Sequence, residues 1–567
     1  MVANPKRITF LFLLMASVSI NVFADDWPRF RGPGGNGVAT DASKIPTAWS
    51  PSANLAWKTE MPGPGASSPI IVGGKALITC YSGYGLSQEN PGKIENLVRH
   101  LVCLDAKSGK KLWQKDVPVT LPEDPYAGIG VTAHGYASHT PVSDGKNVYA
   151  FFGKSGVHAF TLDGEPLWSA DVGKESDPTK WGSSSSPIVY KNSVIVTASA
   201  ESQAIVGIDK ESGKELWRQE AEGLDGMWGT PTLVKVDDAR TDLVMCVAKE
   251  LWGLNPDNGE LRWFADATGA QHAYSSVVID GKRVYVFAGR GGGSVAVDAG
   301  GKGDISKSNT VWTGRDTASF ASPVRYENKL FVISRGILTV VDSESGKRLQ
   351  QLRLKGALQT GSRYGSLDYA SPVVVGDHLY YLNGSGQMYV FKIGDELEQV
   401  AVNRVTTEKE VFWGSPAISD GNLLIRSAKY LYCVKDQGDE VKPEDTQVAD
   451  KDDEEDEQPA AGRQSGGRPG GSRQQFDPMA MFGQFDSDSD GKITSAELEG
   501  NRMADRLMTL DKDDDDAVSK DEFRNGISSL FRRGGSSGGR SGGGRSGGGY
   551  NQKDSRPDRP QRPKSGG

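Results

Sequence analysis

Two acidic segments near the C-terminus carry oxygen-bearing side chains at spacings that suit a metal ion. Residues 486–497 read Asp-Ser-Asp-Ser-Asp-Gly-Lys-Ile-Thr-Ser-Ala-Glu, the pattern of an EF-hand loop. The expected ligands are Asp486, Asp488, Asp490, the carbonyl of Lys492, Thr494 and Glu497. Calcium prefers several hard oxygen ligands, and Gly491 permits the sharp turn that brings them together. The segment therefore predicts a calcium site.

A second segment, residues 511–522, repeats this pattern with one departure. Its expected ligands are Asp511, Asp513, Asp515, the carbonyl of Ala517, Ser519 and Glu522. Asp516 stands where glycine is usual, and because aspartate tolerates the left-handed backbone, we expect weaker binding here and not its loss. Only 13 residues separate the two loops, which favours one shared central helix. We expect two bound Ca²⁺ ions.

The rest of the chain shows no residue pattern typical of catalysis. The six histidines form no metal-ligand spacing. The four cysteines (Cys80, Cys103, Cys246 and Cys433) include neither a Cys-x-x-Cys motif nor an adjacent pair. We predict no catalytic residues and buried free thiols, with a Cys80–Cys103 bridge left open because export would permit one.

The N-terminus indicates export. Lys6 and Arg7 precede an apolar run from Ile8 to Phe23, and Ala24 ends a small-residue cleavage pattern. A membrane anchor is the alternative, but the run is shorter than the roughly 20 residues of a spanning helix. We expect residues 1–24 to be removed as a signal peptide, leaving a mature protein without a transmembrane segment in the periplasm or at the cell surface.

Charge is distributed unevenly along the 567 residues, whose formal net charge is -8. Residues 436–457 contain 12 acidic and 2 basic residues, whereas residues 532–567 contain 9 basic and 2 acidic ones. We interpret the first as the start of a disordered linker and the second as a disordered Gly/Arg/Pro-rich tail. We expect no nucleic-acid partner, because an exported chain rarely meets RNA.

A short element ending mostly in proline recurs along the chain. Its last residues are Pro69, Pro141, Pro187, Pro231, Val277, Pro323, Pro372 and Pro416. After the first interval, which two insertions lengthen, the spacing is 44 to 49 residues. One four-stranded blade of a β-propeller has this length. A tryptophan near the end of many repeats is expected to pack against the neighbouring blade.

The two ends of the repeat array complement each other. The last repeat, after Tyr430–Val434, lacks a fourth strand, and a strand of the missing type, Leu55–Lys58, stands unassigned near the N-terminus. Pairing them would close the ring and leave no open sheet edge. We therefore predict an all-β fold with an eight-bladed β-propeller, followed by a small α-helical EF-hand module.

The repeats resemble those of quinoprotein-type (PQQ-like) propellers. The resemblance rests on the Leu-Asp-x-x-x-Gly-Lys-x-x-Trp and Ser-Ser-Pro elements and covers roughly residues 27–435. Enzymatic members of that family hold pyrroloquinoline quinone (PQQ) beside an adjacent-cysteine disulfide and oxidise alcohols or sugars. This chain has no adjacent cysteines, and the family's calcium ligands and catalytic aspartate find no matching positions, so we expect no bound PQQ.

Aromatic residues also recur near the start of each innermost strand. Five stand three positions before the end of the repeated element, and two stand slightly earlier. The set comprises Tyr136, Trp181, Trp228, Tyr274, Phe320, Tyr369 and Trp413. We predict that they surround the entrance of the central channel and bind a protein, peptide or polysaccharide, with His139, His272 and Arg363 between them. Packing between blades is the equally weighted alternative.

These inferences divide the chain into a signal peptide (1–24), a PQQ-like propeller (25–435), a linker (436–475), an EF-hand pair (476–531) and a tail (532–567). We predict a calcium-binding, exported propeller that acts as a non-catalytic binding or scaffold protein of the cell envelope. A PQQ-dependent dehydrogenase is one alternative. The other is an assembly scaffold resembling the propeller lipoprotein of the outer-membrane β-barrel assembly machinery, although no cysteine at the cleavage site is available for lipidation.

Overall fold

The computed structural model describes residues 26–39, 45–87, 90–125, 135–289, 292–354 and 368–441, and near the C-terminus residues 482, 485, 490–495, 497–498, 507–513, 515–524 and 558–560. The chain forms two compact units, residues 1–451 with 554–567 and residues 452–553. The predicted signal peptide and the predicted boundaries at residues 475 and 531 lie outside the described residues.

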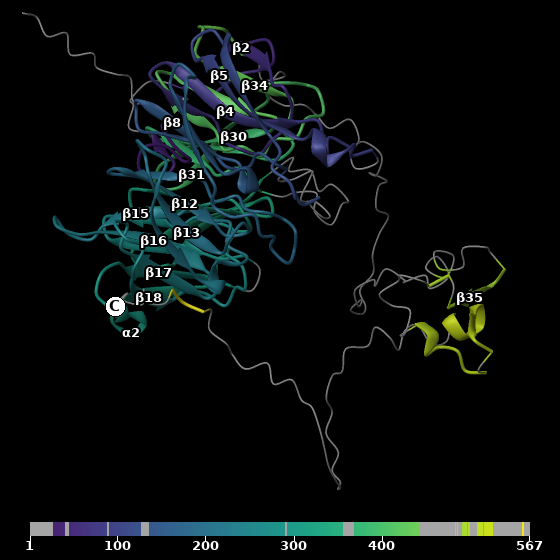
Figure 1. Cartoon of the computed structure of the whole chain (residues 1–567). Coiled ribbons are helices and arrows are strands. Elements are labelled where there is room, and N and C mark those ends of the chain that lie inside the picture. Colours follow the sequence, from purple (N-terminus) through teal and green to yellow (C-terminus); the bar gives the residue numbers. More distant parts are fainter. Residues whose placement is uncertain are drawn as a thin grey trace, which may run out of the picture. The chain divides into compact units, whose positions relative to one another are not determined.

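Eight sheets of four principal strands build the first unit, which confirms the predicted eight-bladed propeller (Figure 1). Blade 1 comprises β3 (Ile70–Val72), β4 (Lys75–Ser82), β5 (Val98–Asp105) and β6 (Lys111–Pro118), and blade 2 comprises β7 (Val142–Ser143), β8 (Asn147–Phe151), β9 (Val157–Thr161) and β10 (Pro166–Ala170). Blade 3 comprises β11 (Ile188–Tyr190), β12 (Ser193–Ala198), β13 (Ala204–Asp209) and β14 (Glu215–Glu220), and blade 4 comprises β15 (Thr232–Lys235), β16 (Thr241–Val247), β17 (Glu250–Leu254) and β18 (Leu261–Asp266).

The remaining blades follow the same antiparallel order. Blade 5 comprises β19 (Val278–Asp280), β20 (Arg283–Phe287), β21 (Ser294–Asp298) and β23 (Thr310–Gly314), and blade 6 comprises β24 (Val324–Tyr326), β25 (Lys329–Ser334), β26 (Ile337–Asp342) and β27 (Arg348–Arg353). Blade 7 comprises β28 (Val373–Val375), β29 (His378–Leu382), β30 (Met388–Ile393) and β31 (Leu397–Asn403), and blade 8 comprises β32 (Ala417–Ser419), β33 (Asn422–Arg426), β34 (Tyr430–Val434) and β2 (Leu55–Glu60). Short elements in the connections are η1 (Ile94–Asn96), η2 (Gly153–Ser155), η3 (Glu222–Leu224), β22 (Gly303–Asp304) and α2 (Ser306–Asn309).

The N-terminal strand β2 closes the ring as the outer strand of blade 8. It pairs antiparallel with β34, and Trp57 lies opposite Cys433. The sequence predicted this pairing because β34 had no outer neighbour of its own. All four cysteines are buried and free, so the Cys80–Cys103 bridge does not form.

Tryptophans on the outer strands join neighbouring blades. The indole N–H of Trp57 donates to the carbonyl of Ala106 at 3.1 Å, and Trp113 donates in the same way to Leu162. Each ring also covers a turn glycine of the next blade, such as Gly109 beneath Trp57. A side chain on Gly109 would collide with that ring, so the glycine is required by the close approach. The tryptophans therefore have the packing role that the repeats predict.

Apolar side chains between the blades form the core. One cluster, for example, combines Ile70 and Leu77 of blade 1 with Val148 and Ala150 of blade 2. Each blade buries its faces against two neighbours, so stability rests on the interfaces between blades.

The segment Trp27–Ala39 crosses the central channel and contacts innermost strands of several blades. Trp27 exchanges backbone hydrogen bonds with Ile71 of blade 1, and the Ser143 N–H of blade 2 donates to the Pro28 carbonyl. At its other end β1 (Val38–Ala39) pairs in parallel with β28 of blade 7. The N-terminal segment thus fills part of the channel that the blades surround.

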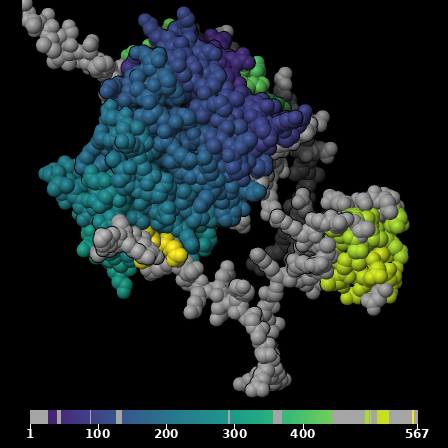
Figure 2. Space-filling view, viewed as in Figure 1, coloured from purple at the N-terminus to yellow at the C-terminus, as the bar shows by residue number. Residues whose placement is uncertain are grey.

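Residues 558–560, at the other end of the chain, contact blade 4 (Figure 2). The guanidinium of Arg559 bonds both carboxylate oxygens of Glu250, at 2.6 and 2.9 Å, and lies over the ring of Phe264. The second unit contains a two-stranded sheet of β35 (Lys492–Thr494) and β36 (Ala517–Ser519). In the described residues no helix is long and apolar enough to cross a membrane.

Candidate functional site

A closed ring of eight hydrogen bonds encircles the channel. In each blade, the penultimate residue of the repeated element is Ser or Thr, and its hydroxyl accepts the backbone N–H of the corresponding residue in the preceding blade. The bonds measure 2.9 to 3.0 Å and run through Ser68, Thr140, Ser186, Thr230, Ser276, Ser322, Ser371, Ser415 and back to Ser68. This explains why the element recurs, because each copy supplies both a donor and an acceptor to the ring.

These hydroxyls line a cavity of about 220 Å³ together with the residues two positions earlier in each repeat. At those earlier positions blades 4 to 8 carry Trp228, Tyr274, Phe320, Tyr369 and Trp413, whereas blades 1 to 3 carry Ala66, Ser138 and Ser184. Trp181 and Phe30 complete the lining, and Phe30 comes from the segment that crosses the channel. The cavity is therefore aromatic on one side and lined by small residues on the other.

The aromatic side is continuous. Ring centroids of neighbouring members lie 4.7 to 6.4 Å apart, from Trp181 through Trp228, Tyr274, Phe320 and Tyr369 to Trp413. All six rings are half-buried. We call these six residues the aromatic arc. Such rings present apolar faces to a ligand while the Trp N–H and Tyr O–H groups can form hydrogen bonds.

The structure brings together six of the seven aromatic residues that the sequence singled out. The seventh, Tyr136, is 3% exposed and packs against Tyr81 and Tyr84. Its hydroxyl donates to the Asp124 carbonyl at 2.8 Å, so it holds an insertion in place and does not line the cavity.

The three polar residues expected between the aromatic rings have different positions. His139 is buried, and His272 is exposed beside Trp228 and Tyr274. Arg363 lies outside the described residues.

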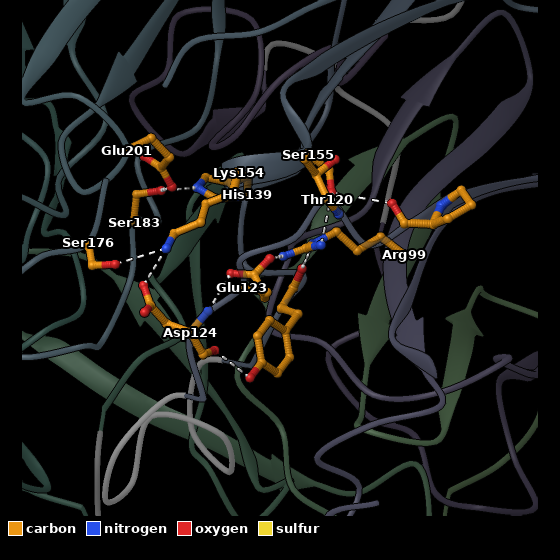
Figure 3. Close-up of polar contacts among 12 residues, drawn as sticks. Arg99, Thr120, Glu123, Asp124, His139, Lys154, Ser155, Ser176, Ser183 and Glu201 are labelled. Atoms are coloured by element: carbon orange, nitrogen blue, oxygen red, sulfur yellow. Dashed lines mark hydrogen bonds and ion pairs between the residues drawn. The ribbon is translucent and has the colours of Figure 1, made fainter. Parts of the chain in front are cut away.

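A buried polar cluster joins residues of blades 1 to 3 (Figure 3). Two of its members, His139 and Ser183, are chain neighbours of the small lining residues Ser138 and Ser184. Arg99 and Glu123 form an ion pair at 2.5 Å, with side chains only 1% and 2% exposed. Lys154 pairs with Asp124 at 2.7 Å. These bonds tie the insertion after β6 to strand β5 and to the connection between β8 and β9, so we interpret the cluster as structural support.

Glu201 belongs to the same cluster and has an altered protonation equilibrium. The Ser183 hydroxyl donates to its carboxylate at 2.6 Å, and the His139 ring lies 3.0 Å from that hydroxyl. Burial raises the pKa of Glu201 to about 7. Ser183 is itself 1% exposed, so this Ser–His–Glu group offers no accessible nucleophile.

The sequence did not predict this cluster. Its members come from separate strands and connections, share no spacing, and resemble ordinary surface charges in the sequence. The insertions that separate the first two repeats were the only signal that this part of the propeller differs.

The predicted calcium loops are described in part. Ile493 and Val518, at the same position in the two loops, lie opposite each other in the β35–β36 pair. Carboxylate oxygens of Asp511, Asp513 and Glu522 lie within 4.8 Å of one another. Asp516 adopts the left-handed conformation with φ 61°, which is the conformation expected at the loop position that glycine usually occupies. Three of the carboxylates predicted for the second loop therefore lie together, whereas Asp515 pairs with Lys492 at 2.6 Å.

The loop-closing glutamates are held in place by the backbone. The N–H groups of Lys512 and Ser519 donate to Glu522 at 2.7 and 2.9 Å, and these bonds lower the pKa of Glu522 to about 2. Glu497 accepts the Thr494 N–H in the corresponding geometry, and the Lys492 N–H donates to Asp490. The other predicted side-chain ligands of the first loop, Asp486 and Asp488, lie outside the described residues.

A sequence-family model described as outer membrane protein assembly factor BamB matches residues 98–351 and 203–442. The two matches together extend from 98 to 442, which is more than half of the chain. The chain belongs to this family. Among curated proteins there is no match.

Similar solved structures include BamB from Moraxella catarrhalis, with a TM-score of 0.48 and 11% identity over 68% of this chain and 99% of that one. A europium-containing methanol dehydrogenase has a TM-score of 0.46 and 11% identity over 71% and 89% of the two chains. The quinohemoprotein alcohol dehydrogenase ADHIIG from Pseudomonas putida HK5 has a TM-score of 0.47 and 12% identity over 74% and 82%.

The cavity does not fit PQQ well. The quinone carries three carboxylates, whereas the described residues that line the cavity are aromatic, hydroxylic or small and include no charged side chain. The lining supplies hydroxyl and ring N–H donors but no cation that would balance three buried negative charges. We therefore assign no catalytic step to this site.

Proposed function

We propose that this protein is a non-catalytic binding protein of the cell envelope, in which the propeller binds an extended polypeptide at the aromatic arc and the C-terminal module binds calcium. The observation that carries the proposal is the arc itself. Six half-buried rings from consecutive blades line one cavity above a ring of hydroxyls. Rings that served only as blade packing would not need to border a cavity.

The chemistry of the lining favours an uncharged ligand surface. Aromatic rings stack on apolar side chains, and hydroxyls that already accept one hydrogen bond keep a hydrogen for a ligand carbonyl. The family description names an assembly factor for outer membrane proteins, which supports a polypeptide ligand and a location in the envelope. Export by means of residues 1–24 is part of the same proposal.

Intrinsic tryptophan fluorescence tests the binding site, because three members of the arc are tryptophans. The full-length protein would be titrated with unstructured peptides rich in aromatic residues and, separately, with neutral oligosaccharides. We expect a saturable change with the peptides that is lost when Trp228 and Trp413 are both changed to alanine. Binding of oligosaccharides alone would contradict the polypeptide assignment, and no binding of either class would contradict the proposed site.

A second candidate function, PQQ-dependent alcohol or sugar oxidation, has support only from the family resemblance. Adding PQQ and calcium to the purified protein should give neither a stoichiometric quinone absorbance nor dye reduction with alcohols or aldoses. Either result would favour the enzyme over the binding protein.

Calcium binding has its own test. Equilibrium dialysis with radioactive calcium should show two ions per full-length chain, with dissociation constants of roughly 10⁻⁴ to 10⁻³ M, the range of extracellular modules. Glu497→Gln and Glu522→Gln should each remove one ion, because bidentate closure of a loop needs the carboxylate. Glu499→Gln is the matched control and should retain both ions. A protein that binds no calcium, or variants that bind as the parent does, would refute the assignment.

A further inference from the structure

Two arginines in the segment that crosses the channel point to a site that the proposed function does not use. Arg31 is 1% exposed, and Arg29, two residues earlier, is partly exposed. The Nη2 group of Arg31 donates to the carbonyls of Asn36, at 3.1 Å, and Pro323. Arg29 donates more weakly to the carbonyl of Pro231 at 3.4 Å. All of these acceptors are neutral.

Three other donor atoms of the two side chains lack acceptors among the described residues. Nε and Nη1 of Arg31 and Nε of Arg29 are buried without a hydrogen-bond partner among the described residues. Neither guanidinium has a carboxylate within ion-pair distance there, although many other arginines of the propeller do, such as Arg99 with Glu123. Burial lowers the pKa of Arg31 to about 9, and the neighbouring charge of Arg29 contributes.

Both groups remain charged near neutral pH, and they stand two residues apart in the segment that crosses the channel. Buried charges in proteins are normally paired, because removal from water is costly without a counter-charge. Here the residues supply only carbonyl dipoles. The unpaired edges of a guanidinium are planar forks that match the oxygens of an oxyanion.

The backbone supports this interpretation. Arg31 adopts φ 64°, a left-handed conformation that is costly for a long side chain. The following turn uses glycines with positive φ, including Gly32 and Gly35, so the chain bends sharply around the two side chains. The Gly37 N–H donates to the Arg31 carbonyl and closes the turn. The local structure therefore holds Arg31 in the channel at an energetic cost.

We propose that Arg29 and Arg31 bind a small inorganic oxyanion of the sulfate or phosphate class inside the propeller channel. The partly exposed side chain of Arg29 gives the ion access from solvent. Phe30, between the two arginines, lines the cavity of the aromatic arc. A bound anion would neutralise the pair and hold the segment that forms this part of the cavity wall.

Thermal unfolding of the full-length protein in sulfate tests the proposal. Sulfate from about 0.1 to 50 mM would be added at constant ionic strength with sodium gluconate, whose anion is too large for an enclosed site. Because a ligand that binds only the folded state stabilises it by mass action, we expect a saturable rise in Tm of roughly 3 °C. Arg31→Met should abolish the rise, and Arg353→Met, which alters an exposed arginine, should retain it.

The outcomes separate specific binding from a general salt effect. Sulfate also stabilises folded proteins non-specifically at high concentration. An equal rise in the parent and Arg31→Met would show only this effect and would overturn the proposal. A rise produced equally by chloride would overturn the oxyanion assignment. If Arg31→Met does not fold, Arg29→Met tests the same site and should also lose the sulfate response.

Discussion

The two sides of the channel mouth use the same repeat position in opposite ways. In blades 4 to 8 this position carries the large rings from Trp228 to Trp413, which border the cavity. In blades 1 to 3 it carries Ala66, Ser138 and Ser184. Here the buried polar cluster pairs Arg99 with Glu123 and Lys154 with Asp124, and Glu201 accepts a hydrogen bond from Ser183.

The difference shows how a symmetric fold acquires an asymmetric site. Every blade contributes a hydroxyl to the ring, because ring closure requires all eight. The position two residues earlier is free of that requirement. It can therefore supply ligand-facing rings in some blades and leave room for packed insertions in others. We expect the polar side to govern stability and the aromatic side to govern binding.

The largest expected effect is on the polar side. Glu123→Ala would leave the Arg99 charge buried without its partner, so we expect a loss of about 3 to 5 kcal/mol in unfolding free energy. Asp163→Ala is the matched control, because the Lys75–Asp163 pair is exposed, with Asp163 85% exposed, and should cost well under about 1 kcal/mol. Urea unfolding measures both variants. Equal losses would show that the buried cluster gives no special support.

A smaller effect should depend on pH. The folded pKa of Glu201 is about 7, against an ordinary value of 4.5, so the unfolded state ionises first as the pH rises. Its contribution to stability is therefore greatest below about pH 4.5 and falls as the pH rises towards 7. Between pH 5 and 8 the parent should lose about 2 kcal/mol more than Glu201→Gln, which cannot ionise. If the urea midpoints of the parent and of Glu201→Gln change equally between pH 5 and 8, Glu201 is not held in its neutral form.

The smallest effect on stability is expected on the aromatic side. Trp413→Ala removes a half-buried ring of the arc and should cost no more than about 2 kcal/mol. Trp312 is 8% exposed and packs at the contact between blades 5 and 6. Trp312→Ala should therefore lower the unfolding free energy by about 3 to 5 kcal/mol. Similar losses for both would mean that the arc is packing, and the distinction between the two sides would fail.

Most of the fold was predictable from residues that recur. The Ser/Thr-Pro elements, the turn glycines and the outer-strand tryptophans each repeat with the blade, and the unassigned strand Leu55–Lys58 completed the count. The predicted aromatic positions also recur, and six of the seven line one cavity. Tyr136 differed because its ring packs against Tyr81 and Tyr84 and is buried.

The remaining features depend on contacts between residues far apart in the chain. Arg99 of β5 meets Glu123 of the insertion after β6, and Arg31 meets the Pro323 carbonyl 292 residues away only after the ring has closed. Periodic patterns are visible in a sequence because each blade must satisfy the same local hydrogen bonds and packing. Burial, charge pairing and the content of the channel are set by where the blades and insertions meet in space, so only the tertiary structure decides them.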